Sequence, residues 1–171
     1  MSGRPVSSIT PLGRRMLRLG LLFSLALIVA DQLTKFLVMA YVLPDSRAVT
    51  LTPFLNFVVV WNRGVSFGLF SHDWGGAPWV LSALAVAIVV LLCIWLTRAR
   101  RGLTALALGA VIGGAIGNVI DRARFGAVYD FVDLHYAGWH WPAFNLADSA
   151  ITLGVVALLV DSLLFDRQSG H

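Results

Sequence analysis

Residues 109–122 read GAVIGGAIGNVIDR, an apolar stretch in which small residues recur and polar residues come last. Glycines occupy every fourth position, at Gly109, Gly113 and Gly117. In a helix these glycines share one face, and a stripe of small residues lets a second helix approach closely. The neighbouring stripe passes from Gly114 to Asn118 and Arg122, two side chains that need polar partners inside a membrane. The stretch therefore predicts a closely packed membrane helix beside a cleft that becomes polar toward one end.

The chain contains four apolar stretches of about the 20 residues that a helix needs to cross a bilayer. They cover about residues 17–41, 79–96, 103–120 and 144–165. We therefore expect one all-α membrane domain over residues 1–171, with four transmembrane helices. Residues 1–16 form a tail in this prediction, and residues 42–78 and 121–143 form two long connections.

Charge is scarce in this sequence. Hydrophobic residues make up 58% and charged residues 13%, against about 45–50% and about 25% in soluble domains. The cations are twelve Arg and one Lys, and the anions are nine Asp with no Glu. Soluble helical proteins place Glu and Lys on their hydrated faces. The composition excludes intrinsic disorder and argues against a soluble globular domain.

The positions of the cations predict the orientation of the helices. A net charge of +4 could indicate a nucleic-acid partner, but the arginines flank apolar stretches, which is the positive-inside pattern. The flanking residues are Arg4, Arg14, Arg15, Arg18, Arg98, Arg100, Arg101 and Arg167. We therefore expect both termini and the 98–101 connection to face the cytoplasm, and no nucleic acid to bind. The two long connections then lie on the extracytoplasmic side.

The first long connection has a β pattern. Residues 57–61 are rich in β-formers, residues 62–64 are a turn signal, and residues 65–70 can return as a second strand. We expect a small β-sheet element and a short amphipathic segment on the extracytoplasmic side. Their apolar side chains could contact lipid or a lipid-bearing ligand, although an interfacial loop without a ligand fits the same pattern.

Ionisable residues near the apolar stretches are the candidates for function, because they are costly in lipid. Asp31 and Lys35 are four residues apart and can pair on one helix face. A structural ion pair explains both. Asp121 could likewise pair nearby, beside Arg122. Asn118 and Arg122 exceed what helix packing requires.

Two aspartates are candidates for a catalytic pair. Asp148 follows Asn145 by three residues, and a capping-box start of the fourth helix would explain both residues. Asp130 is an acid in an apolar stretch at the same membrane face, and Asp133 competes with it. Two carboxylates at one depth suit acid–base hydrolysis, because one can be ionised and activate water while the other stays protonated and polarises a carbonyl.

Other chemistries fit less well. The four histidines lack metal-ligand spacing, and no Gly-x-Ser-x-Gly motif occurs, so we expect no metal and no cofactor. A Ser–Lys peptidase would have to use Lys35. A small transporter or scaffold that passes solute through the polar cleft is the alternative from outside the enzymes.

At this point the motifs resemble the bacterial lipoprotein signal peptidases (signal peptidase II). The matching blocks occur in the family's order and span about residues 17–165. They are Asp31-Gln32-x-x-Lys35, Asn62-x-Gly64-x-x-Phe67, Gly113-Gly114-x-x-Gly117-Asn118-x-x-Asp121-Arg122, Val128-x-Asp130-Phe131 and Phe144-Asn145-x-Ala147-Asp148. One departure is Tyr129, where a small β-branched residue is expected. It neighbours the acid and is not itself a reacting group.

The resemblance implies an aspartic endopeptidase of the bacterial cytoplasmic (inner) membrane. Such an enzyme removes signal peptides from prolipoproteins by hydrolysing the bond before a diacylglyceryl-modified cysteine. The resemblance implies Asp130 and Asp148 as the catalytic pair. It implies substrate-binding roles for Asn62, Gly64, Asn118 and Arg122, and structural support from Asp31, Lys35, Asp121 and Asn145. The partners it implies are lipid-modified precursors and membrane lipid, and we expect a monomer.

Overall fold

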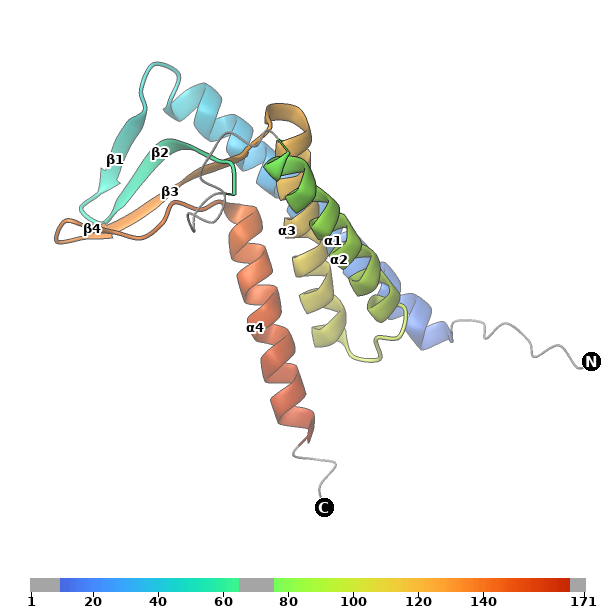
Figure 1. The fold of residues 1–171 in the computed structure, drawn as a ribbon. Coiled ribbons are helices and arrows are strands. Elements are labelled where there is room, and N and C mark those ends of the chain that lie inside the picture. Colours follow the sequence, from blue (N-terminus) through green and yellow to red (C-terminus); the bar gives the residue numbers. More distant parts are fainter. Residues whose placement is uncertain (1–9, 65–75, 167–171) are drawn as a thin grey trace, which may run out of the picture.

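A computed structural model describes residues 10–64 and 76–166, which form four helices and a four-stranded sheet (Figure 1). The helices are α1 (Pro11–Leu37), α2 (Ala77–Leu96), α3 (Gly102–Phe125) and α4 (Leu146–Asp166), and a π-helical turn, η1 (Val38–Val42), continues α1. The strands are β1 (Ala48–Thr52), β2 (Leu55–Asn62), β3 (Val128–Tyr136) and β4 (Trp139–His140). The sheet lies at one end of the helix bundle, and α1 begins and α4 ends at the other (Figure 1).

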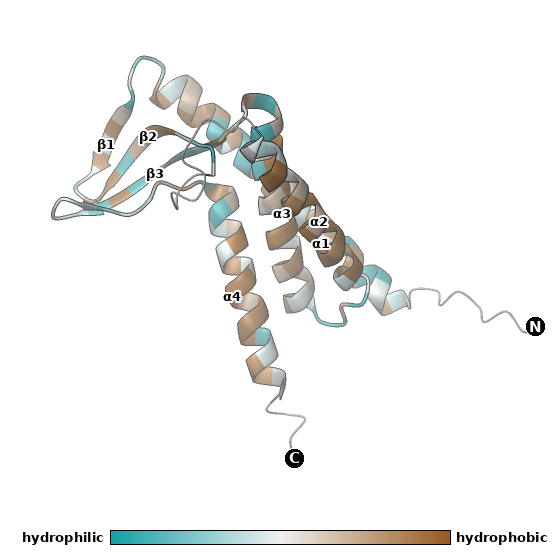
Figure 2. Ribbon diagram, in the orientation of Figure 1, coloured by the Kyte–Doolittle hydropathy of each residue, from teal (hydrophilic) through white to brown (hydrophobic). Residues whose placement is uncertain are grey.

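All four helices are long and apolar enough to cross a membrane, by length and composition. In α3, 67% of the most apolar window is buried, against 11–22% in the other three helices. Helix α3 is therefore the centre of the bundle, and the other helices expose apolar faces. Apolar residues run along the helices, and polar residues gather toward their ends (Figure 2). The prediction of four apolar helices is confirmed.

The first helix begins earlier than expected. We predicted a tail up to residue 16, but α1 starts at Pro11. Thr10 is the N-cap, and its Oγ1 accepts a hydrogen bond from Gly13 N at 3.2 Å. Pro11 suits the first helical position because its missing N–H would be unsatisfied there anyway. The arginines in this segment mark the boundary of the apolar stretch, but they do not end the helix, because arginine is a good helix former.

The two small-residue stripes of α3 contact two different helices. A Cβ added at Gly109 would collide with the carbonyl oxygen of Gly20 on α1, and one at Gly113 would lie 2.8 Å from the Ser24 oxygen. A Cβ at Gly114 would instead collide with the Ala147 oxygen at the start of α4. The predicted close approach is confirmed, and it places α1 and α4 on adjacent faces of α3.

Gly109→Ala is expected to lower the free energy of unfolding by about 1–3 kcal/mol, because overpacking would push α1 away from α3. Gly102→Ala is the matched control on the same helix, since its new Cβ would meet only Leu19 Cδ2 at an ordinary 3.9 Å. Thermal unfolding in detergent measures both variants. Equal melting temperatures for the two would contradict the close packing.

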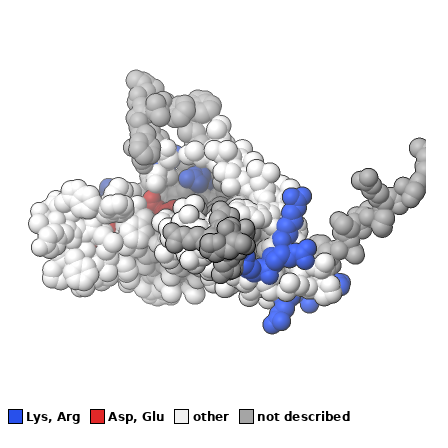
Figure 3. Space-filling model, turned by 90° about the horizontal axis from the view of Figure 1, so that it is seen from below, with Lys and Arg blue, Asp and Glu red and all other residues white. Residues whose placement is uncertain are grey.

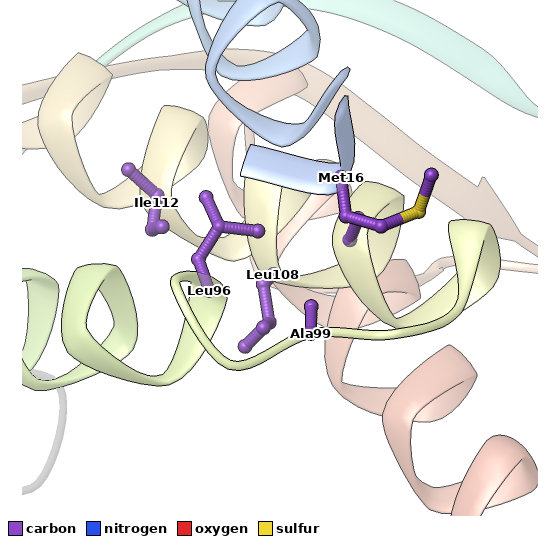
Figure 4. Close-up of a cluster of buried hydrophobic side chains, with 6 residues drawn as sticks. Met16, Leu96, Ala99, Leu108 and Ile112 are labelled. Carbon is purple, nitrogen blue, oxygen red and sulfur yellow. The ribbon is translucent and has the colours of Figure 1, made fainter. Parts of the chain in front are cut away.

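A compact apolar cluster lies at the end of the bundle away from the sheet (Figure 4). Its buried members come from α1, α3, and the end of α2 with the connection that follows: Met16, Leu96, Ala99, Ala105, Leu108 and Ile112. Leu96, Ala105 and Leu108 are fully buried. The cluster joins three helices where the α2–α3 connection turns.

Cations surround the same end of the molecule. Figure 3 looks onto this end and shows Lys and Arg side chains gathered there. The arginines of this region are Arg14, Arg15, Arg18, Arg98, Arg100 and Arg101. Asp161 on α4 is buried beside them, where it accepts hydrogen bonds from Arg101 Nη1 at 2.9 Å and Thr104 Oγ1 at 2.7 Å. This polar link between α3 and α4 was not predicted from the sequence.

The sheet is antiparallel, with the order β1-β2-β3-β4. The strand predicted at residues 57–61 is confirmed as part of β2. The return strand expected at residues 65–70 lies outside the described residues. Strand β2 pairs instead with β1 and with β3, which comes from the second long connection. The predicted small β-sheet element is therefore confirmed, and two of its strands, β3 and β4, come from the second long connection.

A second apolar cluster joins the sheet to the end of α1. Val38, Leu43, Tyr129 and Phe131 are its buried members. This packing fixes one face of β3 against η1, so the alternate side chains of β3 point toward α3 and α4.

Candidate active site

Asp148 lies in the first turn of α4 and forms a reciprocal cap with Asn145. Asp148 N donates to Asn145 Oδ1 at 2.9 Å, and Asn145 N donates to Asp148 Oδ2 at 3.2 Å. The capping-box interpretation of these two residues is thus confirmed. The cap leaves Asp148 Oδ1 to accept a hydrogen bond from Asn118 Nδ2 at 2.8 Å. The Asp148 carboxylate is therefore held from both α4 and α3.

Asp130 points from β3 toward the start of α4. Its carboxylate accepts hydrogen bonds from Asn145 Nδ2 at 2.7 Å and from Asn62 Nδ2 at 3.0 Å. Asn62 lies on β2 opposite Val128, so the pairing of β2 with β3 brings its amide to Asp130. The Asp130 side chain is almost fully buried.

Asn145 joins the two carboxylates. Its side-chain amide binds Asp130 and also lies 3.3 Å from Asn118 Oδ1, while its backbone N–H binds Asp148. Each of the four carboxylate oxygens accepts a hydrogen bond from a neutral amide. Arg122 interacts with both carboxylates electrostatically. The two acids are thus held as a pair by uncharged donors, and no hydrogen bond from a cation neutralises either carboxylate among the described residues.

This environment raises the pKa of Asp130 to about 7, first because burial disfavours the charged form and second because the Asp148 charge repels it. The amides of Asn62 and Asn145 oppose the shift, since they stabilise the ionised carboxylate. Near neutral pH, Asp130 can therefore hold a proton.

Asp133, the competing acid, has different neighbours. Its carboxylate accepts a hydrogen bond from Asn56 Nδ2 at 2.8 Å and lies 2.8 Å from His140 Nδ1. Asn56 and His140 stabilise its ionised form, so the pKa of Asp133 is lowered despite the opposing effect of burial. The geometry favours Asp130 over Asp133 as the partner of Asp148.

A buried ionic cluster supports the site. Lys35 Nζ lies 2.8 Å from Asp31 Oδ2 and 2.7 Å from Asp121 Oδ2. Asp31 and Asp121 are each 1% exposed and Lys35 5%. The predicted Asp31–Lys35 pair is confirmed. Asp121 also pairs nearby, with Lys35 on α1.

The cluster positions both acids through the backbone. Asp31 Oδ1 accepts a hydrogen bond from Ala147 N at 3.0 Å, next to Asp148. Asp121 Oδ2 accepts one from Tyr129 N at 3.2 Å, next to Asp130. The carboxylate at the first turn of α4 also interacts favourably with the positive end of the helix dipole.

Sequence reasoning missed Gln32 as a member of this cluster. Its Nε2 donates to Asp121 Oδ1 at 2.9 Å and lies 3.4 Å from the Gly117 oxygen. Gln32 thereby links α1 to α3. The sequence did contain a signal for this role, because Gln32 is a polar residue next to Asp31 in an otherwise apolar stretch.

An apolar groove of about 290 Å³ lies between α2, α3 and α4, and it is lined by Asn118, which binds Asp148. Its walls are apolar except at Asn118 and Arg122. Arg122 Nε is buried and has no hydrogen-bond partner among the described residues. The cleft predicted from the 109–122 stretch is therefore present, and it offers an unpaired donor where it becomes polar.

Asn62 and Gly64 form a tight turn above the site. Asn62 Oδ1 accepts a hydrogen bond from Gly64 N at 2.8 Å, which orients the amide that binds Asp130. Gly64 has φ = +84°, and a Cβ there would collide with Leu81 on α2. The positive φ favours glycine at this position, and a larger residue would also require the Leu81 side chain to move.

The arrangement limits which chemistry is available. Lys35 is bound by two carboxylates, so a Ser–Lys peptidase that needs a free lysine base is disfavoured. Within the part of the chain that the structure describes, no group of three or more His, Cys, Asp or Glu could hold a metal ion. The pair of acids beside the groove is the feature of this site that could carry out acid–base chemistry.

Fold and site together define a four-helix membrane protein with two neighbouring aspartates beneath a small sheet. A family model described as signal peptidase (SPase) II matches residues 23–164. The chain belongs to the signal peptidase II family.

Individual relatives agree with this assignment. The chain is 50% identical over 147 residues to a lipoprotein signal peptidase of Methylorubrum extorquens (strain PA1), which covers 85% of this chain and 86% of that protein. It is 45% identical over 141 residues to one of Burkholderia mallei (strain SAVP1), which covers 82% and 84%. A solved bacterial membrane enzyme has a TM-score of 0.74 at 27% identity and covers 89% of this chain and 91% of its own.

Proposed function

We propose that this protein is an intramembrane aspartic endopeptidase that removes signal peptides from prolipoproteins. It hydrolyses the bond before the diacylglyceryl-modified cysteine. The observation that carries the proposal is the pairing of Asp130 and Asp148 through Asn145, next to an apolar groove between the helices. Family membership supports the substrate class, since the relatives are named lipoprotein signal peptidases.

The two acids have different roles in the proposed reaction. Asp130 carries the proton at the start, because its pKa is raised to about 7. Asp148 is ionised and takes a proton from water as the water oxygen bonds to the peptide carbonyl carbon, while Asp130 donates its proton to the carbonyl oxygen. The tetrahedral intermediate then collapses: the C–N bond breaks, Asp148 returns its proton to the leaving nitrogen, and Asp130 takes a proton back from one hydroxyl of the intermediate, which leaves the carboxylic acid.

The polar residues around the acids hold the substrate backbone in this proposal. Arg122 Nε and Asn118 lie where the groove becomes polar, so they bind backbone carbonyl groups of the cleavage sequence. Asn62 and Gly64 close the site from the sheet side. The signal peptide reaches the acids laterally from the bilayer, along the apolar walls of α2 and α4.

The proposal is tested with purified protein and two precursors of identical sequence, one carrying diacylglyceryl-cysteine and one unmodified. We expect cleavage of the lipidated precursor directly before the modified cysteine. Equal cleavage of both precursors, or cleavage elsewhere, would refute the proposed substrate class.

The rate of cleavage is expected to depend on pH on both sides of an optimum. As pH rises through about 7, Asp130 loses the proton that it must donate, so kcat/KM falls by about tenfold per unit. Because the pair must carry a single proton, the rate also falls at low pH. The measurement is kcat/KM from about pH 4 to 9 with constant detergent and salt. A flat profile with chemistry rate-limiting would contradict the shared-proton pair.

We propose that the sheet and the active site face the extracytoplasmic side of the inner membrane. The basic residues at 14–18 and 98–101 lie at the opposite end of the bundle, which is the arrangement that the positive-inside rule associates with the cytoplasm. All the proposed site residues come from one chain, so we infer that a monomer is active. A reporter inserted after Arg100 is expected to be cytoplasmic. An extracytoplasmic reporter would reverse the orientation.

A further inference from the structure

A second groove lies between α1 and the last turn of α3. Its volume is about 230 Å³, and it shares no lining residue with the groove that leads to Asn118 and Arg122. Its walls are mainly apolar, with Phe36 from α1 and Met39 and Ala40 from η1 on one side and Phe125 from α3 on the other. Both helices belong to the apolar spans, so this groove opens where membrane lipid meets the protein.

The ionisable side chains that line this groove are Lys35, Asp121 and Arg124. Lys35 and Asp121 are buried and bind each other at 2.7 Å, and Asp121 also accepts hydrogen bonds from Gln32 and the Tyr129 backbone. Both charges are therefore paired within the protein.

Arg124 differs from the other two because it is exposed. Its guanidinium lies 4.9 Å from the centre of the Phe125 ring, and Nη1 lies 3.4 Å from Gln32 Oε1. Neither neighbour is anionic, and among the described residues no carboxylate lies within ion-pair distance of it. The groove therefore presents an unneutralised cation next to an apolar wall.

An anion with an attached hydrocarbon chain satisfies both features. A free phosphate would leave the apolar wall unfilled, while an uncharged lipid would leave the guanidinium without its counter-ion. Membrane phospholipids combine a phosphate with ester-linked chains at the depth where spanning helices end.

We propose that this groove binds a membrane phospholipid, with the phosphate on the Arg124 guanidinium and the chain region against Phe36, Met39 and Phe125. The site is separate from the proposed catalytic pair and does not rest on the peptidase activity. The bound lipid fills the wedge between the ends of α1 and α3, on the side of the Lys35–Asp121 pair that faces the membrane.

Native mass spectrometry of the delipidated full-length protein in detergent tests the proposal. The probes are dioleoylphosphatidylglycerol, dioleoylglycerol with the same chains but no phosphate, and inorganic phosphate. We expect one phospholipid to be retained, and Arg124→Gln to weaken its apparent affinity about five- to tenfold. Arg47→Gln is the matched control, because Arg47 is an exposed cation outside this groove, and this change should leave the affinity unaltered.

A second variant tests the apolar part of the site. Ala40 is exposed and lines the groove, so Ala40→Phe fills the space and should reduce phospholipid binding while Arg124 is intact. Equal loss from Arg124→Gln and Arg47→Gln would overturn the proposal, as would equal retention of dioleoylglycerol. Binding of inorganic phosphate alone would show an anion site that does not select a lipid, which would also overturn it.

Discussion

Asp130→Asn and Asp148→Asn are each expected to reduce cleavage of the lipidated precursor by at least about 10³-fold. Each change keeps the size of the side chain but removes one carboxyl group, so either the proton donor or the base is lost. Because the two acids act as a unit, the double variant should be about as inactive as either single variant. Single-turnover cleavage by purified protein measures the loss.

Asp133→Asn is the control for this prediction. It removes the second acid of β3, whose partners are Asn56 and His140, and it should leave the rate within a few-fold of the original. Melting temperatures of all three variants show whether they fold. Near-normal cleavage by a folded Asp130→Asn or Asp148→Asn protein would exclude the proposed pair, and an equal loss in Asp133→Asn would remove the preference for Asp130.

Lys35→Met is expected to destabilise the protein by about 3–5 kcal/mol, the cost of leaving a buried charge without its partner. Methionine preserves most of the side-chain volume but leaves Asp31 and Asp121 without the ammonium that lies within 2.8 Å of both. Both carboxylates are 1% exposed, so water cannot replace the lost partner. Thermal unfolding in detergent, followed by circular dichroism, measures the change.

The triple variant Asp31→Asn, Lys35→Met, Asp121→Asn separates charge from packing. It has no unpaired buried charge, so it should recover part of the stability that Lys35→Met loses. If Lys35→Met proves as stable as the original protein, the ionic cluster does not contribute as inferred. The expected destabilisation also means that loss of activity in Lys35→Met is no sign of a lysine base.

The helices could be predicted from the sequence because span length and apolar content are local properties. Their ends were less certain. The start of α1 was missed because Arg14, Arg15 and Arg18 end the apolar run without ending the helix, while the local signal was the Thr10 cap followed by Pro11. The glycine spacing in residues 109–122 correctly indicated close packing, since helical periodicity alone puts those glycines on two adjacent stripes.

The sheet could be predicted only in part. Strand β2 has a local pattern of β-forming residues, but it pairs with β3, which is more than sixty residues away along the chain. The first four residues of strand β3 are all buried, so both faces of the strand are covered there. Its sequence therefore does not show the apolar–polar alternation of a half-exposed strand. Its position depends on packing against η1 on one side and the helices on the other.

The sequence by itself determined four apolar helices, a polar end to the central one, and a small set of acids near that end. Tertiary structure alone decided which acids meet. The β2–β3 register brings Asn62 to Asp130, and Asn145 then connects that carboxylate to Asp148, while Asp133 binds Asn56 and His140. Likewise, Asp121 faces Lys35 whereas Arg122 faces the groove, because consecutive helix residues point about 100° apart. Hydropathy and helical spacing are encoded locally, but the partner of a buried charge depends on which distant segments pack around it.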